Sequence, residues 1–157
     1  MISYHSGDIF DSNCNIICHE VDCLGGDFDV KFKRKCHDSF NRYINFVKRF
    51  KKEPMKLLGR CCTGVFDDNE DRWVANLFGY FDSGNNTDVE ALEKSLLDCK
   101  NFAEVCDYSI AIPFGIGHGT NWVTEVRPMI ERVFRDFPNE VEIWSDNNGA
   151  NAPSITE

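Results

Sequence analysis

Two glycine-rich segments, each preceded by an apolar run, carry the side chains best suited to chemistry. The first holds His19, Asp22, Gly25, Gly26 and Asp27, and the second holds Gly115, Gly117, His118 and Gly119. Glycines let backbone amides approach an anion closely, and the start of a following helix adds partial positive charge. The spacing matches neither a P-loop nor a G-x-G-x-x-G fingerprint. Together the two segments predict a site for a ligand that carries a diphosphate.

Histidine and carboxylate side chains beside these glycines are the candidates for acid–base work. His118 lies in a loop with no core to fill, so it can donate to a phosphate or act as a general acid. His19 ends an apolar strand and is either catalytic or a satisfied core histidine. Asp22 and Asp27 either orient a water molecule or cap the turn and the following helix, and Glu20 is a weaker third carboxylate.

The eight cysteines include no C-x-x-C pair, and their spacing to the histidines fits no common zinc pattern. We therefore expect reduced thiols, no metal site and no cofactor. Cys18 and Cys23 lie near the proposed site, which leaves a thiol nucleophile as an alternative to simple buried packing.

Strand-like and helix-like segments alternate along the chain and would position these loops. Strands are predicted at 2–5, 15–19, 58–66, 73–78, 109–114 and 141–144, and helices at 29–50, 87–106 and 122–135. The first helix is expected to break near His37, and Thr87 with Glu90 indicates a capping box at the start of the second. Ligands of such sheets bind beyond the carboxyl ends of the strands, where both glycine-rich loops fall. The pattern predicts a three-layer α/β/α domain with a mixed, largely parallel sheet of about six strands.

Composition is typical of one globular domain: 157 residues, 42% hydrophobic and 27% charged. The net charge is −9, yet residues 30–56 hold ten Lys or Arg against Asp38 and Glu53, so this segment is +8 and the remainder −17. The basic segment is either the solvated face of amphipathic helices or an attraction for an anionic macromolecule. No apolar run is long enough to span a membrane, and the first ten residues contain neither a basic leader nor an apolar run followed by a cleavage site, so we expect a cytoplasmic protein. We also expect a monomer.

Six short motifs follow one another along residues 1–145. They are Gly7-Asp8-Ile9, residues 16–26 ending in Gly25-Gly26, and the segments 58–61, 74–79, 87–92 and 110–119. In order and spacing this set resembles the macro domains, also called the ADP-ribose-1″-phosphate-processing family. It looks most like the short stand-alone members of bacteria and tailed phages, which for a viral member implies the host cytoplasm. The resemblance implies a macro domain at 1–145 and a flexible C-terminal tail at 146–157.

Position by position, the resemblance also implies contacts with ADP-ribose. Asp8 would accept a hydrogen bond from the adenine amino group, with Ile9 beside the ring and Trp144 either as an adenine wall or as core. The remaining implied contacts are Gly25, Gly26 and Phe28 at the distal ribose, Gly115, Ile116, Gly117, Gly119 and Thr120 at the diphosphate, and Tyr80 after the strand 73–78. His19 is the first catalytic candidate, and the lysine of the glycohydrolases is missing, so a lysine adduct is not expected.

These features lead to two main classes of function, and binding of nucleic acid through the basic segment 30–56 is a third. The first is an enzyme that hydrolyses an ADP-ribosyl linkage or removes the phosphate of ADP-ribose 1″-phosphate, with His19, Asp22, Asp27 and His118 as catalytic candidates. The second is a module that binds ADP-ribose or a related nucleotide without turnover. The expected partners are ADP-ribose or its 1″-phosphate, carried by protein or nucleic acid, and no membrane.

Overall fold

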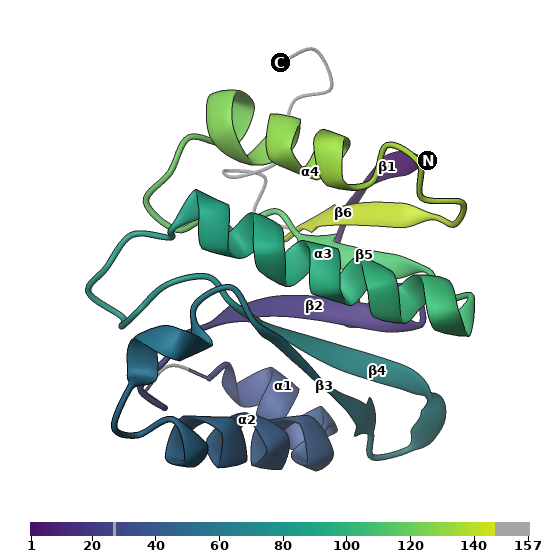
Figure 1. Cartoon of the computed structure of the whole chain (residues 1–157). Helices are drawn as coiled ribbons and strands as arrows, with labels where there is room; N and C mark the ends of the chain where they lie inside the picture. The colour runs from purple at the N-terminus through teal and green to yellow at the C-terminus, as the bar shows by residue number, and fades with distance from the viewer. Residues whose placement is uncertain (27, 147–157) are drawn as a thin grey trace.

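A six-stranded sheet forms the middle layer of the computed structural model, which describes residues 1–26 and 28–146 (Figure 1). The strands are β1 (Ile2–Ser6), β2 (Ile16–Val21), β3 (Cys61–Phe66), β4 (Asn69–Phe78), β5 (Ile110–Pro113) and β6 (Val141–Ser145), in the order β1-β6-β5-β2-β4-β3. Every neighbouring pair is parallel except β3 with β4. The predicted mixed, largely parallel sheet is confirmed.

Two helices cover one face of the sheet, α3 (Val89–Cys106) and α4 (Arg127–Val133) (Figure 1). The buried residues of α3 recur at intervals of three and four, which is the spacing of one helical face. Leu92, Leu96 and Ile130 from these helices belong to one apolar cluster with Ile16 and Ile110 of the sheet. Burial of this cluster fixes α3 and α4 beside the central strands β2 and β5.

The opposite face is covered by α1 (Val30–Lys35) and α2 (His37–Arg49) (Figure 1). The helix predicted at 29–50, with a break expected near His37, is broken at Cys36, whose φ of −144° and ψ of 80° are not helical. α2 packs closely against Gly64 of β3, because a Cβ there would lie 2.4 Å from the Ser39 backbone nitrogen. The helices thus complete the predicted α/β/α layering, with their lysines and arginines mostly in solvent.

Two helix starts differ from the sequence prediction. The N-cap of α3 is Asp88, whose side chain accepts a hydrogen bond from the Ala91 amide, and not Thr87. The helix predicted at 122–135 begins with a π-helical turn, η3 (Trp122–Val126), before α4. Of the tail predicted at 146–157, residues 147–157 lie outside the described part. Among residues 1–26 and 28–146, no helix is both long and apolar enough to span a membrane.

Candidate functional site

Two adjoining cavities open at the carboxyl ends of the parallel strands. The first, of about 750 Å³, lies between the segments that follow β1, β5 and β6, together with the start of α1. The second, of about 370 Å³, lies beside the end of β2. The residues that line both are Asp29, Phe32, Pro113, Gly115, Ile116 and His118. Because they share this wall, the two cavities can hold the two ends of one elongated ligand.

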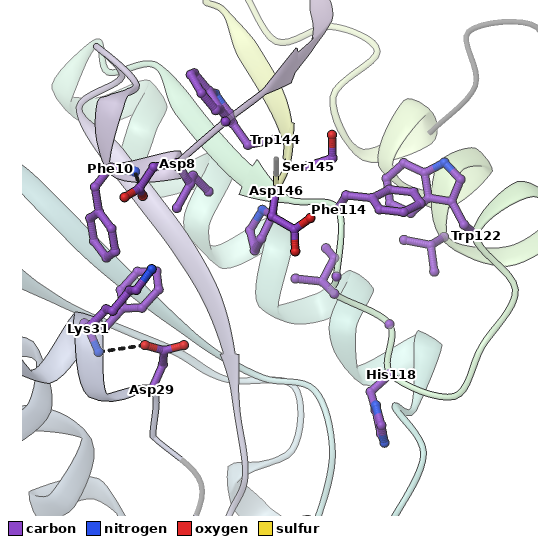
Figure 2. Close-up of a pocket in the computed structure, with 18 of the residues that line it drawn as sticks. Asp8, Phe10, Asp29, Lys31, Phe114, His118, Trp122, Trp144, Ser145 and Asp146 are labelled. Atoms are coloured by element: carbon purple, nitrogen blue, oxygen red, sulfur yellow. Dashed lines mark hydrogen bonds between the residues drawn. The ribbon is translucent and has the colours of Figure 1, made fainter. Parts of the chain in front are cut away.

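One end of the first cavity is formed by Asp8 and Trp144 (Figure 2). Asp8 follows β1 and caps the 3-10 turn η1 (Ile9–Asp11), because its Oδ1 accepts a hydrogen bond of 3.0 Å from the Phe10 amide. Trp144 stacks on His5 with ring centroids 5.0 Å apart, and its Nε1 donates to Glu142 over 2.8 Å. Ile9 lines the same cavity, so three residues predicted to contact adenine are brought together.

The glycine-rich loop after β5 forms the wall shared by the cavities. Gly117 and Gly119 have φ of +81° and +76°, a region that favours glycine. The amides of Ile116 and Gly117 are already engaged, donating to the Pro113 carbonyl over 3.2 Å and to Glu20 Oε1 over 2.9 Å. The Thr120 amide donates to the Gly117 carbonyl. The loop was expected to offer a run of amides to a diphosphate, but these three point elsewhere, whereas no backbone bond engages those of Gly115 and Gly119 among the described residues.

Glu20 is the side chain that holds this loop from beneath. Its Oε2 accepts a hydrogen bond of 2.5 Å from the Thr87 hydroxyl, so Thr87 ties the β4–α3 loop to the same carboxylate. Gly79 leaves the space that the carboxylate needs, since a Cβ there would lie within 3.0 Å of it. Burial raises the pKa of Glu20, while the hydrogen bonds from Thr87 and the loop backbone oppose the rise.

His19 lines the second cavity but is only 5% exposed. Its ring stacks on Phe32, with centroids 4.0 Å apart, and its Nε2 lies 2.6 Å from Asn76 Oδ1. Because the Asn76 amide nitrogen donates to Ser39, the Asn76 oxygen is the acceptor and His19 Nε2 carries the proton. The predicted catalytic histidine is therefore oriented by a buried network.

Comparison with known proteins identifies the fold. No family model matches the chain, and no curated protein sequence matches it. The macrodomain of Mycobacterium tuberculosis DarG superposes with a TM-score of 0.77 at 20% identity, covering 98% of this chain and 99% of that one. The chain has the macrodomain fold.

Two other solved structures that resemble the chain hold a nucleotide. Thermosipho africanus DarTG in complex with ADP-ribose has a TM-score of 0.66 at 18% identity, with 88% of this chain and 40% of that one covered. The Oceanobacillus iheyensis macrodomain with ADP has a TM-score of 0.63 at 13% identity, with 94% and 84% covered.

Not every predicted site residue of this chain reaches the cleft. Asp22 is 2% exposed and holds the glycine turn, because it accepts hydrogen bonds from the Tyr43 hydroxyl and, over 3.2 Å, from the Gly26 amide. Gly25 and Gly26 line neither cavity, and Phe28 packs edge-on against His19. Asp27 lies outside the described residues. Of the first glycine-rich segment, His19 lines the second cavity, whereas Asp22, Gly25 and Gly26 form a turn that lines neither cavity.

The second cavity does hold Tyr80 and His118, the remaining predicted residues. Their ring centroids are 6.5 Å apart, and His118 is exposed. Of the two cysteines considered as nucleophiles, burial raises the pKa of Cys23 to about 12, and Cys18 is fully buried. Within the described part of the chain no group of three or more His, Cys, Asp or Glu side chains could hold a metal ion.

Three residues that line the cleft were not among the main site residues predicted from the sequence. Asp29 caps α1 by accepting a hydrogen bond of 2.8 Å from the Lys31 amide, and it lines both cavities. Lys31 adds a cation to the first cavity, and Glu20 adds a carboxylate to the second. Glu20 could have been found from the sequence, because it is a charged residue at the end of an apolar strand. A carboxylate is rarely buried there unless hydrogen-bond donors surround it.

Proposed function

We propose that this macrodomain binds ADP-ribose in the cleft formed by the two cavities. The observation that carries the proposal is the shared wall at Gly115 to His118, with a larger cavity on one side and a smaller one on the other. An ADP-ribose molecule has the same division, an adenosine and a ribose joined by a diphosphate. The ADP-ribose bound to the Thermosipho africanus DarTG structure supports this reading.

The adenosine belongs in the first cavity. Asp8 uses Oδ1 as a cap, and its Oδ2 makes no hydrogen bond with the described residues, so Oδ2 accepts from the adenine amino group. Ile9 and Trp144 supply apolar contacts on either side of the ring. The position of Asp8 beside this cavity, on an exposed turn, is what favours a role in binding over a role in capping alone.

The diphosphate belongs at the shared wall. The amides of Gly115 and Gly119 are the donors there, because those of Ile116, Gly117 and Thr120 already have partners. Lys31, on the opposite side of the first cavity, adds a positive charge without an ion pair to any described acidic residue (Figure 2). Charge-assisted contacts of this kind are stronger than neutral ones.

The distal ribose then enters the second cavity, where hydrolysis at its anomeric carbon is the proposed reaction. A water oxygen attacks the anomeric carbon as the bond to the leaving group breaks. Asp29 orients that water and accepts the proton that it loses, and His118, an exposed imidazole on the shared wall, gives a proton to the leaving group. His19 Nε2 already makes a hydrogen bond to Asn76, so we assign His19 no proton transfer. Its role is to help position the distal ribose ring.

Isothermal titration calorimetry with ADP-ribose, ADP and AMP tests the binding proposal. ADP-ribose should bind with the highest affinity, because it alone fills both cavities. A mono-ADP-ribosylated protein incubated with wild type and His118→Ala tests turnover: loss of release with retained affinity supports hydrolysis. No binding of any of the three nucleotides would refute the assignment, and binding without release would leave a binding module as the function.

A further inference from the structure

The charged groups of the second cavity are unlike those of a phosphate site. Its acidic lining residues are Glu20 and Asp29, and its imidazoles are His19 and His118. No Lys or Arg lines this cavity within residues 1–26 and 28–146, and Lys31 lines only the first. Phosphate groups in proteins are usually held by Arg, Lys or several free amides.

The Glu20 carboxylate cannot turn away from the cavity. Gly117 N and Thr87 Oγ1 hold its two oxygens at 2.9 and 2.5 Å, and these donors belong to different loops. Gly79 lies against the same carboxylate on another side. The Glu20 carboxyl group is therefore held in one position at this cavity rather than moving among several side-chain positions.

The imidazoles do not balance these carboxylates. His19 is buried, stacked on Phe32 and bound to the Asn76 oxygen, so it cannot move toward a ligand. His118 is exposed and is the one of these two imidazoles able to approach a ligand, so a single imidazole faces two carboxylates. Ribose hydroxyls, in contrast, are donors that suit carboxylate acceptors.

We propose that the second cavity selects an uncharged distal ribose and discriminates against ADP-ribose 1″-phosphate, with Glu20 and Asp29 as the residues that set the preference. This inference rests on the proposed function, since it concerns the same cleft. It assigns the protein to ligands whose distal ribose ends in a hydroxyl group or in a glycosidic or ester linkage. The phosphatase activity considered from the sequence is then not its reaction.

Competition binding measures the preference directly. For wild type, the dissociation constant of ADP-ribose 1″-phosphate should exceed that of ADP-ribose at least tenfold, and no inorganic phosphate should be released from the 1″-phosphate. Glu20→Gln keeps an acceptor for Gly117 and a partner for Thr87, and Asp29→Asn keeps an acceptor for the Lys31 amide. Each should lower the ratio of the two constants several-fold. Glu90→Gln removes an exposed carboxylate that lines neither cavity and should leave the ratio unchanged.

The outcomes separate the two proposals. Equal affinity of wild type for both ligands, or release of inorganic phosphate, would overturn the selectivity while the binding function stands. A ratio that survives both Glu20→Gln and Asp29→Asn would overturn the assignment to these carboxylates. Failure of wild type to bind either ligand would overturn the proposed function itself, and the inference with it. Circular dichroism confirms that each variant is folded, and the two variants test the idea independently.

Discussion

Gly115→Val and Gly117→Val should change different properties of the protein, although the two glycines lie two positions apart in one loop. The first should weaken ligand binding, and the second should lower the free energy of unfolding. A Cβ at Gly117 would lie 2.5 Å from Val126 Cγ2 and 2.8 Å from Thr120 Oγ1, and the φ of Gly117 is +81°. A Cβ at Gly115 would meet nothing within 4 Å, and the φ of Gly115 is not in the left-handed region. The added side chain is therefore directed into the protein at Gly117 and into open space at Gly115, which lines both cavities.

The expected magnitudes follow from these geometries. At Gly117, a left-handed φ costs a non-glycine residue about 1–2 kcal/mol, and overpacking against Val126 adds about 1–3 kcal/mol. Gly117→Val should therefore lower the free energy of unfolding by about 2–5 kcal/mol. Gly115→Val should change it by no more than about 0.5 kcal/mol, as for most surface substitutions. Its side chain would instead obstruct the ligand and weaken ADP-ribose binding at least tenfold, about 1.4 kcal/mol.

Urea titration followed by circular dichroism gives the free energies of unfolding, and calorimetry with ADP-ribose gives the affinities of the folded variants. Equal stability of the two variants would refute the clash at Gly117. Wild-type affinity in Gly115→Val would show that the diphosphate does not pass over Gly115, and the proposed place of the ligand would fall with that result.

Three further changes test other parts of the structure. Asp8→Asn keeps the cap on the Phe10 amide but loses the carboxylate, so calorimetry should show ADP-ribose binding weakened about tenfold, and unchanged affinity would remove Asp8 from the site. Gly64→Ala should lower the free energy of unfolding in urea by about 2 kcal/mol or more, because its Cβ would meet the backbone of α2; wild-type stability would contradict that close packing. Glu20→Gln should raise the melting temperature at pH 7, because a carboxyl whose pKa is raised by folding destabilises the protein when ionised. The gain should shrink as the pH falls through the folded-state pKa toward about 4, and a gain that persists there would have another cause.

The layers and strands were predictable because burial leaves a local pattern in the sequence. The apolar runs around Ile16 and Ile110 belong to strands with both faces covered, and α3 shows its buried face at helical spacing. The break at Cys36 was placed within one residue of its position. Each of these features depends on neighbours within a few residues along the chain.

Side-chain partners far apart in the sequence were not predictable. Thr87 has the local signature of a helix cap, but its hydroxyl binds Glu20, 67 residues away, and Asp88 caps α3 instead. Asp22 was predicted either to orient a water molecule or to cap the turn; it caps the turn at Gly26, but its second partner, the Tyr43 hydroxyl, was not predicted. A pattern of residue types identifies groups that need partners, but only the tertiary structure decides which partner each group finds.

The pairing of β1 with β6 bears on the order in which the protein is made. Ile2 lies beside Val141, so β1, which is synthesised before the other five strands of the sheet, must wait for almost the whole of the described chain before its neighbour exists. Asp8 and Trp144, at one end of the first cavity, belong to the segments that end these two late-pairing strands. A nascent chain could complete β2, β4 and β5 and still lack the wall of that cavity. Ligand binding would therefore be possible only after β6 had been synthesised. A ligand present at that moment would favour the pairing of β1 with β6, the last step in forming the sheet.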